Sequence, residues 1–177
     1  MKEKLKKIFF NPEEIKEKDA SVYALLDASG SDEVYNKALF YNTRFTALFD
    51  EEELETVSPY LVKLKKDDEV TEWVLDNYAG VNWMSFIQSS KPYTELLQTL
   101  KAFTKTYDEK EEYYIYIRYY DPRAMEITLD MFGEDGRKEW FETIDAMYAR
   151  DTLEEDTLLK FTQKGKEAII LKEKVMA

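Results

Sequence analysis

The residues of this sequence that could do chemistry are acidic side chains and arginines. Four aspartates could in principle work as acid–base pairs or bind a divalent metal: Asp27, Asp50, Asp76 and Asp121. The chain has no histidine and no cysteine. It therefore lacks the commonest general base, the commonest neutral metal ligand and every thiolate site. We expect a protein that is not an enzyme, with no catalytic residue, no metal and no cofactor.

An aromatic segment ends in a run of charged residues, Arg118-Tyr-Tyr-Asp-Pro-Arg123. A strand predicted over 113–120 has apolar or aromatic side chains on both faces, which is typical of a central strand covered by helices. Asp121 and Pro122 favour a helix that begins at Pro122, with Asp121 as its N-cap. Arg123 would then lie beside the positive end of the helix dipole, where it needs a carboxylate partner.

The first predicted strand also ends in an aspartate, Asp27. If this strand and the strand over 113–120 run parallel, their carboxyl ends share one edge of the sheet. We therefore predict an ion pair between Asp27 and Arg118 or Arg123. This pair is either an internal salt bridge or part of a polar pocket that recognises a ligand or peptide. The candidate partner-binding residues are Asp27, Trp83, Arg118, Tyr119, Tyr120, Asp121, Pro122 and Arg123.

Hydrophobic periodicity predicts the elements that must position these residues. Strands are expected over 22–27, 44–50, 81–87 and 113–120, and helices over 32–41, 51–58, 67–79, 90–107 and 122–132. Three β-rich segments follow residue 135 and predict a C-terminal antiparallel β-meander. The pattern favours an α/β fold, α+β in part, with a mixed sheet of strand–helix units flanked by helices. We expect one domain over 1–177, with an α/β core at 22–135 and a β-rich extension at 136–177.

The charge of the chain narrows the class of partner. The formal net charge is −12, which argues against nucleic acid and anionic membranes. A short amphipathic helix over 2–10 would carry Leu5, Ile8 and Phe9 on one side, with its lysines in solvent rather than on a membrane. Its apolar run is too short for a signal peptide or a membrane span, so we expect a cytoplasmic protein.

Several segments, in order, resemble the effector-adaptor chaperone family of bacterial type VI secretion, the Tap or TEC proteins. They include YALLDAS (23–29), EWVLDNYAGVNWMSFIQSS (72–90) and, most specifically, IRYYDPRAME (117–126). The resemblance spans about residues 22–135. Its hallmark falls on Arg118, Tyr119, Tyr120, Asp121, Pro122 and Arg123, with the first-strand aspartate at Asp27. Family members often have phenylalanine near that arginine, where this chain has Ile117 and Tyr119.

The resemblance implies a protein that binds a toxic effector in the cytoplasm and loads it onto the VgrG spike protein. The alternative hypothesis is an immunity-type inhibitor that neutralises a toxin by binding it, because an acidic surface suits a basic toxin. The order of the segments favours the adaptor. An adaptor would be needed for secretion of the effector, whereas an inhibitor would block the toxic activity.

Overall fold

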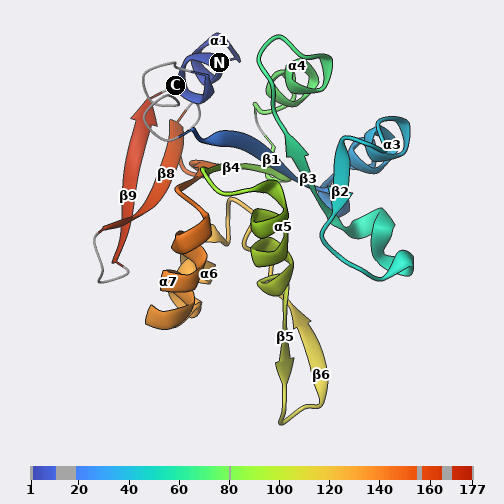
Figure 1. Ribbon diagram of the computed structural model, residues 1–177, viewed down its shortest axis with the longest axis vertical. Coiled ribbons are helices and arrows are strands. Elements are labelled where there is room, and N and C mark those ends of the chain that lie inside the picture. Colours follow the sequence, from blue (N-terminus) through green and yellow to red (C-terminus); the bar gives the residue numbers. More distant parts are fainter. Residues whose placement is uncertain (1, 11–18, 80, 155–156, 165–168, 177) are drawn as a thin grey trace.

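The computed structural model describes residues 2–10, 19–79, 81–154, 157–164 and 169–176. Its main sheet has the strand order β2-β3-β1-β4-β7-β8-β9 (Figure 1). The strands are β1 (Ser21–Asp27), β2 (Phe45–Ala47), β3 (Pro59–Lys63), β4 (Met84–Ser89), β7 (Ala146–Arg150), β8 (Thr157–Lys164) and β9 (Ile169–Met176). Every neighbouring pair is antiparallel.

The predicted combination of helices and strands is confirmed, as is the C-terminal meander of β7, β8 and β9. The prediction of a mixed sheet is wrong for the described strands, because each of them pairs in the antiparallel sense. A helix between two strands is compatible with either direction of pairing. Hydrophobic periodicity locates the elements but does not encode the direction in which the next strand runs.

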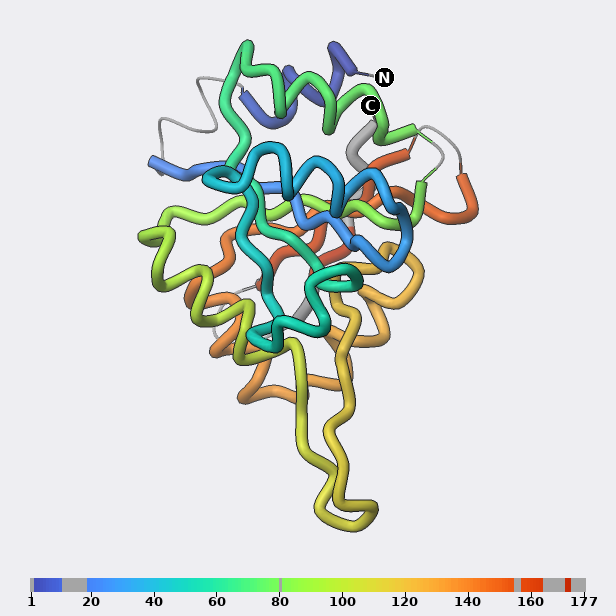
Figure 2. The backbone as a smooth tube through the Cα atoms, turned by 90° about the vertical axis from the view of Figure 1, so that its right-hand side faces the viewer, coloured from blue at the N-terminus to red at the C-terminus, as the bar shows by residue number. Residues whose placement is uncertain are grey.

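Helices cover both faces of the sheet, so the molecule has three layers (Figures 1 and 2). One face is covered by α1 (Lys2–Phe9), α3 (Asp32–Phe40) and α4 (Glu69–Asp76). The other is covered by α5 (Tyr93–Ala102), α6 (Met125–Met131) and α7 (Gly133–Thr143), while two 3-10 helices, η1 (Ala28–Gly30) and η2 (Glu52–Val57), lie in connections. Strand β1 contributes Val22, Ala24 and Leu26 to the first core and Tyr23 and Leu25 to the second.

The aromatic segment is not the central strand that its pattern predicts. Strand β6 (Tyr113–Tyr116) pairs only with β5 (Lys105–Asp108) in the described chain. The two form a hairpin that projects away from the three layers (Figures 1 and 2). The centre of the sheet is already filled by β1 and β4. The predicted helix over 90–107 ends at Ala102 instead, since residues 104–107 are β-branched, aromatic or lysine and continue as β5.

Two helices differ from the sequence prediction. Helix α6 begins at Met125 rather than Pro122, and residues 121–124 form a turn in which the backbone carbonyl of Asp121 accepts bonds from the amides of Ala124 and Met125. The sequence predicts no helix where α7 forms, because the two glycines of GEDGR (133–137) are typical of a loop. Of these two glycines, Gly133 has a positive φ, 67°, and it begins the helix. The fully buried Trp140 then anchors α7 to the second core.

The N-terminal helix is part of the fold. Leu5 and Phe9 of α1 are buried in the first core. Its Lys2 and Lys6 form salt bridges of 2.5 and 2.6 Å with Glu72 of α4. This face of α1 therefore packs against protein. None of the described helices is long and apolar enough to cross a membrane.

Candidate functional site

The predicted ion pair between the first strand and the motif is present. Asp27 is the last residue of β1 and is fully buried. Its Oδ2 accepts a hydrogen bond from Nη2 of Arg118. Its Oδ1 accepts bonds from the backbone amide of Ser29 at 3.0 Å and from the Ser29 hydroxyl at 2.7 Å. Asp27 thus caps η1 and joins the end of β1 to the loop that follows β6.

The other two charged residues of the motif extend this pair into an alternating cluster. Nη2 of Arg118 lies 3.6 Å from Oδ2 of Asp121. Arg123 donates to both carboxylate oxygens of Asp121, from Nε at 3.0 Å and from Nη2 at 2.7 Å. Both carboxylates are buried, whereas the side chains of Arg118 and Arg123 are 43% and 57% exposed. The cluster therefore presents two guanidinium groups to solvent over two buried anions.

The pKa shifts follow from this arrangement. Burial acts to raise the pKa of Asp121, but the bonds from Arg123 outweigh it, so the pKa lies below its ordinary value. Burial acts to lower the pKa of Arg118, and the neighbouring Asp27 charge reverses this and raises the pKa. Asp121 and Arg118 are therefore held in their charged forms at neutral pH.

Asp121 also organises the local backbone, as expected. Its Oδ1 accepts the amide of Arg123 at 2.9 Å. The capped element is the turn over 121–124, since α6 has Ala124 as its N-cap and no side-chain cap bond. The prediction that the Asp121 side chain accepts a backbone amide is confirmed. It caps the turn that precedes α6, however, and not α6 itself.

The remaining motif residues belong mainly to the core. Tyr119 is fully buried, and its hydroxyl donates to the Leu100 carbonyl at 2.9 Å. Tyr120 and Pro122 are also buried. Burial and the Asp27 charge raise the pKa of Tyr120, so its hydroxyl stays neutral. Tyr119 and Tyr120 thus hold the loop against the second core and leave the arginines as the accessible part of the motif.

Trp83 meets the cluster through its backbone. Its carbonyl accepts the Asp27 amide at 2.8 Å. Its side chain turns to the opposite layer and stacks on Trp73 of α4, with ring centroids 6.3 Å apart. The sequence prediction grouped Trp83 with Tyr120, but their side chains pack on opposite faces of the sheet.

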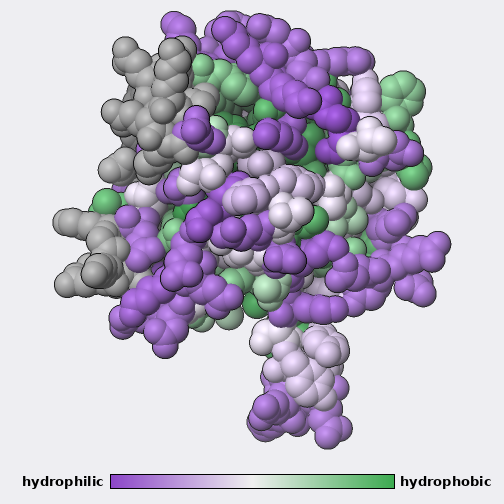
Figure 3. Space-filling view, in the orientation of Figure 1, coloured by the Kyte–Doolittle hydropathy of each residue, from purple (hydrophilic) through white to green (hydrophobic). Residues whose placement is uncertain are grey.

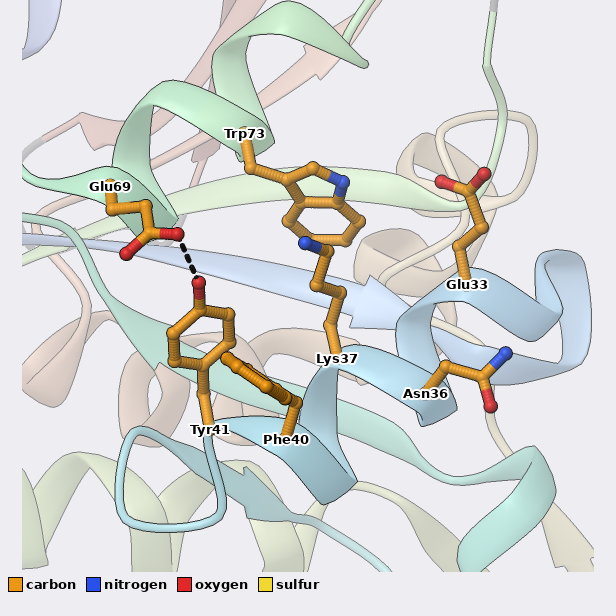
Figure 4. Close-up of a pocket in the computed structure, with 7 residues that line it drawn as sticks. All are labelled: Glu33, Asn36, Lys37, Phe40, Tyr41, Glu69 and Trp73. Carbon is orange, nitrogen blue, oxygen red and sulfur yellow. Dashed lines mark hydrogen bonds between the residues drawn. The ribbon is translucent and has the colours of Figure 1, made fainter.

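A groove between α3 and α4 has Trp73 in its lining (Figure 4). The Lys37 ammonium lies 5.4 Å from the centre of the Trp73 ring and 5.6 Å from that of Tyr41. The Tyr41 hydroxyl donates to Glu69 at 2.5 Å. Phe40 is exposed at the groove's edge. The two rings stabilise the lysine by cation–π attraction, so the groove already contains its own cation.

The hairpin of β5 and β6 is the second surface that the sequence did not locate. Its exposed large side chains are Tyr107, Tyr113, Tyr114, Ile115 and Tyr116, and Figure 3 shows it standing clear of the body. The Ile117 amide donates to the Thr104 carbonyl at 2.8 Å and closes the hairpin at its base. A signal was present in the sequence, since the acidic run 108–112 lies between two aromatic, strand-forming segments.

The four aspartates considered as catalytic groups do not form a shared acidic site. Asp50 is paired with Lys101, and Asp76 with Lys2 at 2.9 Å. Asp27 and Asp121 both belong to the arginine cluster. Across the residues that the structure describes, no group of three or more acidic side chains is placed to hold a metal ion. The geometry offers surfaces for binding, with charged and aromatic side chains at their edges.

Comparison with known proteins gives one match. The model of a family described as "Domain of unknown function (DUF4123)" matches residues 22–139, from β1 into α7. No curated protein and no solved structure matches the chain significantly. The matched region contains every residue of the charged cluster. Strand β7 lies outside it, although β7 pairs with β4 and continues the same sheet.

Proposed function

The chain belongs to the DUF4123 family, and we propose that it is a non-enzymatic adaptor for type VI secretion. It binds an effector protein in the cytoplasm and helps to load it onto the VgrG spike. The family description assigns no function, so the adaptor role is supported by the resemblance of residues 22–135 to effector-adaptor chaperones. The absence of histidine and cysteine from the sequence also favours binding over chemistry.

The projecting hairpin is the observation that carries this proposal. Tyr113, Tyr114, Ile115 and Tyr116 are 40–58% exposed, although aromatic side chains usually contribute to a core. Isolated two-stranded hairpins are marginally stable; the base of this one is held by Tyr116 against Phe49, with ring centroids 4.8 Å apart, and by Lys105 paired with Glu51 at 2.6 Å. Tyrosine is enriched among residues that dominate protein–protein affinity. An aromatic hairpin that stands clear of the body therefore suits the capture of another protein.

A shortened hairpin tests the proposal. Replacing 107–114 by Asn-Gly leaves the paired residues Thr106 and Ile115 next to a two-residue turn, which is a favoured hairpin geometry. We expect this variant to keep its melting temperature and to lose binding to the effector. In a producing strain that lacks the gene, secretion of the effector should be abolished and should be restored by the wild type alone.

Secretion and toxicity separate the adaptor from the inhibitor. Normal export of the effector without this protein contradicts the adaptor function. Self-intoxication of the deletion strain, with block of toxin activity by the purified protein, would instead support the immunity-type inhibitor. The net charge of −12 fits an inhibitor of a basic toxin, but it does not explain the exposed aromatic hairpin.

A further inference from the structure

An apolar pocket lies at the root of the hairpin. It has a volume of about 330 Å³ and lies between the end of α5, the start of β5 and the end of α6. Its lining is mainly apolar, from Ala102, Phe103, Ile117, Met131 and Phe132. Thr106 and Lys105 complete it, and the Lys105 ammonium is paired with Glu51 at 2.6 Å. The Met131 side chain is 73% exposed at the last residue of α6. The pocket is thus apolar and open to solvent, with room for one large side chain of another molecule.

The pocket continues onto one face of the hairpin. Thr106 lines the pocket and pairs with Ile115, and Asp108 pairs with Tyr113. Directly opposed residues of an antiparallel pair project from the same face. Ile115 and Tyr113 therefore extend the pocket's apolar surface along the hairpin towards its tip. A bound segment could place one side chain in the pocket and lie along this face.

The tip of the hairpin is acidic. Residues 108–112 contain four carboxylates and one lysine. Lys110 lies 3.6 Å from Glu111. The carboxylates of Glu109 and Glu112 have no ion pair within the described part of the chain and are exposed. A partner that lies along the hairpin meets this negative charge, so the complementary partner is positively charged.

We propose that this surface binds a basic segment of a partner protein that inserts a bulky apolar side chain into the root pocket. The inference rests on the adaptor function only for the identity of the partner, since the chemistry of the segment follows from the pocket and the acidic tip. Apolar contact in the pocket provides the anchor, and the tip carboxylates select positive charge and speed association. A second copy of this chain is a poor occupant, because two acidic tips repel each other.

The probe is a phage library that displays random 12-residue peptides. Phage that bind the hairpin-shortened variant are first removed, and the remaining phage are selected for binding to the full chain. Enriched peptides should carry net positive charge and one bulky apolar residue. Fluorescence anisotropy of a labelled enriched peptide then measures affinity. Met131→Lys should weaken binding at least tenfold, because it removes apolar lining and places a cation at the pocket mouth, whereas Met131→Glu, which removes the same lining but adds a negative charge, should weaken it clearly less. Leu153→Lys, at a residue that is 93% exposed, is the control for the added charge.

The acidic tip is tested separately. Glu109→Lys should weaken the same peptide severalfold, while Glu33→Lys, an equal charge change on α3, should not. Raising salt from 50 to 500 mM should reduce affinity, because it screens the tip charges. Neutral or acidic peptides, no enrichment, dimerisation through the hairpin, or equal affinity for both Met131 variants would overturn the inference. None of these measurements uses an effector or secretion, so the inference can fail while the adaptor function stands.

Discussion

Removal of Arg118 should destabilise the protein more than removal of its partner Asp27. The two side chains form one ion pair, but Asp27 is buried while Arg118 is 43% exposed. Arg118→Ala leaves a buried carboxylate without its direct cation. Asp27→Ala leaves a guanidinium that is already half in water and still lies 3.6 Å from Asp121. The variant that removes the more exposed residue is therefore the more damaging one.

The magnitudes follow from the contacts. Breaking a buried pair by removing one partner costs about 3–5 kcal/mol. Oδ1 of Asp27 keeps its two bonds from Ser29, and water can enter where the guanidinium was. We therefore expect a cost at or just below the lower end of that range, about 2–3 kcal/mol, for Arg118→Ala. Asp27→Ala removes hydrogen bonds whose donors can reach solvent, which costs about 1–2 kcal/mol.

Urea unfolding followed by tryptophan fluorescence measures both free energies by linear extrapolation. The buried Trp140 makes the signal sensitive to loss of the second core. The double variant Asp27→Ala/Arg118→Ala should cost less than Arg118→Ala alone, because no charge is then stranded. Lys66→Ala, at an exposed position with no ion pair in the described structure, is the control.

Which of the two single variants loses more free energy of unfolding tests this expectation. If Asp27→Ala is the more costly, the burial argument is wrong and the carboxylate acts mainly through Ser29 and η1. If both changes fall within about 0.5 kcal/mol of the wild type, as ordinary surface substitutions do, the pair contributes nothing to stability.

Three further predictions concern stability. Gly30→Ala should destabilise by about 1–3 kcal/mol through overpacking, since the new Cβ would lie 2.5 Å from Cβ of Trp83; an unchanged urea midpoint would contradict this. Trp140→Ala should cost about 3–5 kcal/mol, as loss of a buried tryptophan does, and a small loss would show that α7 docks without it. Acid should remove the stabilisation from Asp121, whose pKa is lowered on folding. That contribution is present above the ordinary carboxyl pKa of about 4 and is lost as the pH falls through the folded-state value. The cost of Asp121→Asn should therefore shrink on acidification, and a constant cost from pH 7 to about 2.5 would refute the linkage.

Much of the site could be predicted because it depends on local chemistry. The aspartate at the end of the first strand and the charged run after the aromatic segment both mark strand or turn ends, and the Asp27–Arg118 pair follows from the need to compensate charge. The prediction that this pair forms where two parallel strands end at one edge of the sheet is nevertheless wrong. The two segments meet through a loop packed on the second core, and their strands are not parallel neighbours.

The hairpin shows why the rest could not be predicted. Tyrosines on both faces of 113–116 have the same pattern in a buried central strand and in an exposed hairpin. Tyr119 and Tyr120, which are buried, differ from Tyr113 and Tyr114 only in where the chain places them. Whether such a segment becomes a buried strand or an exposed hairpin depends on which strand it pairs with, and that pairing depends on the whole sheet.

The bond between Thr104 and Ile117 has a consequence for how such proteins can diversify. It holds the two ends of the hairpin together, so the twelve residues between them leave and re-enter the fold at one point. A segment with adjoining ends can change in length or sequence without altering the path of the surrounding chain. Residues 105–116 should therefore accept replacement or shortening while the three layers keep their structure.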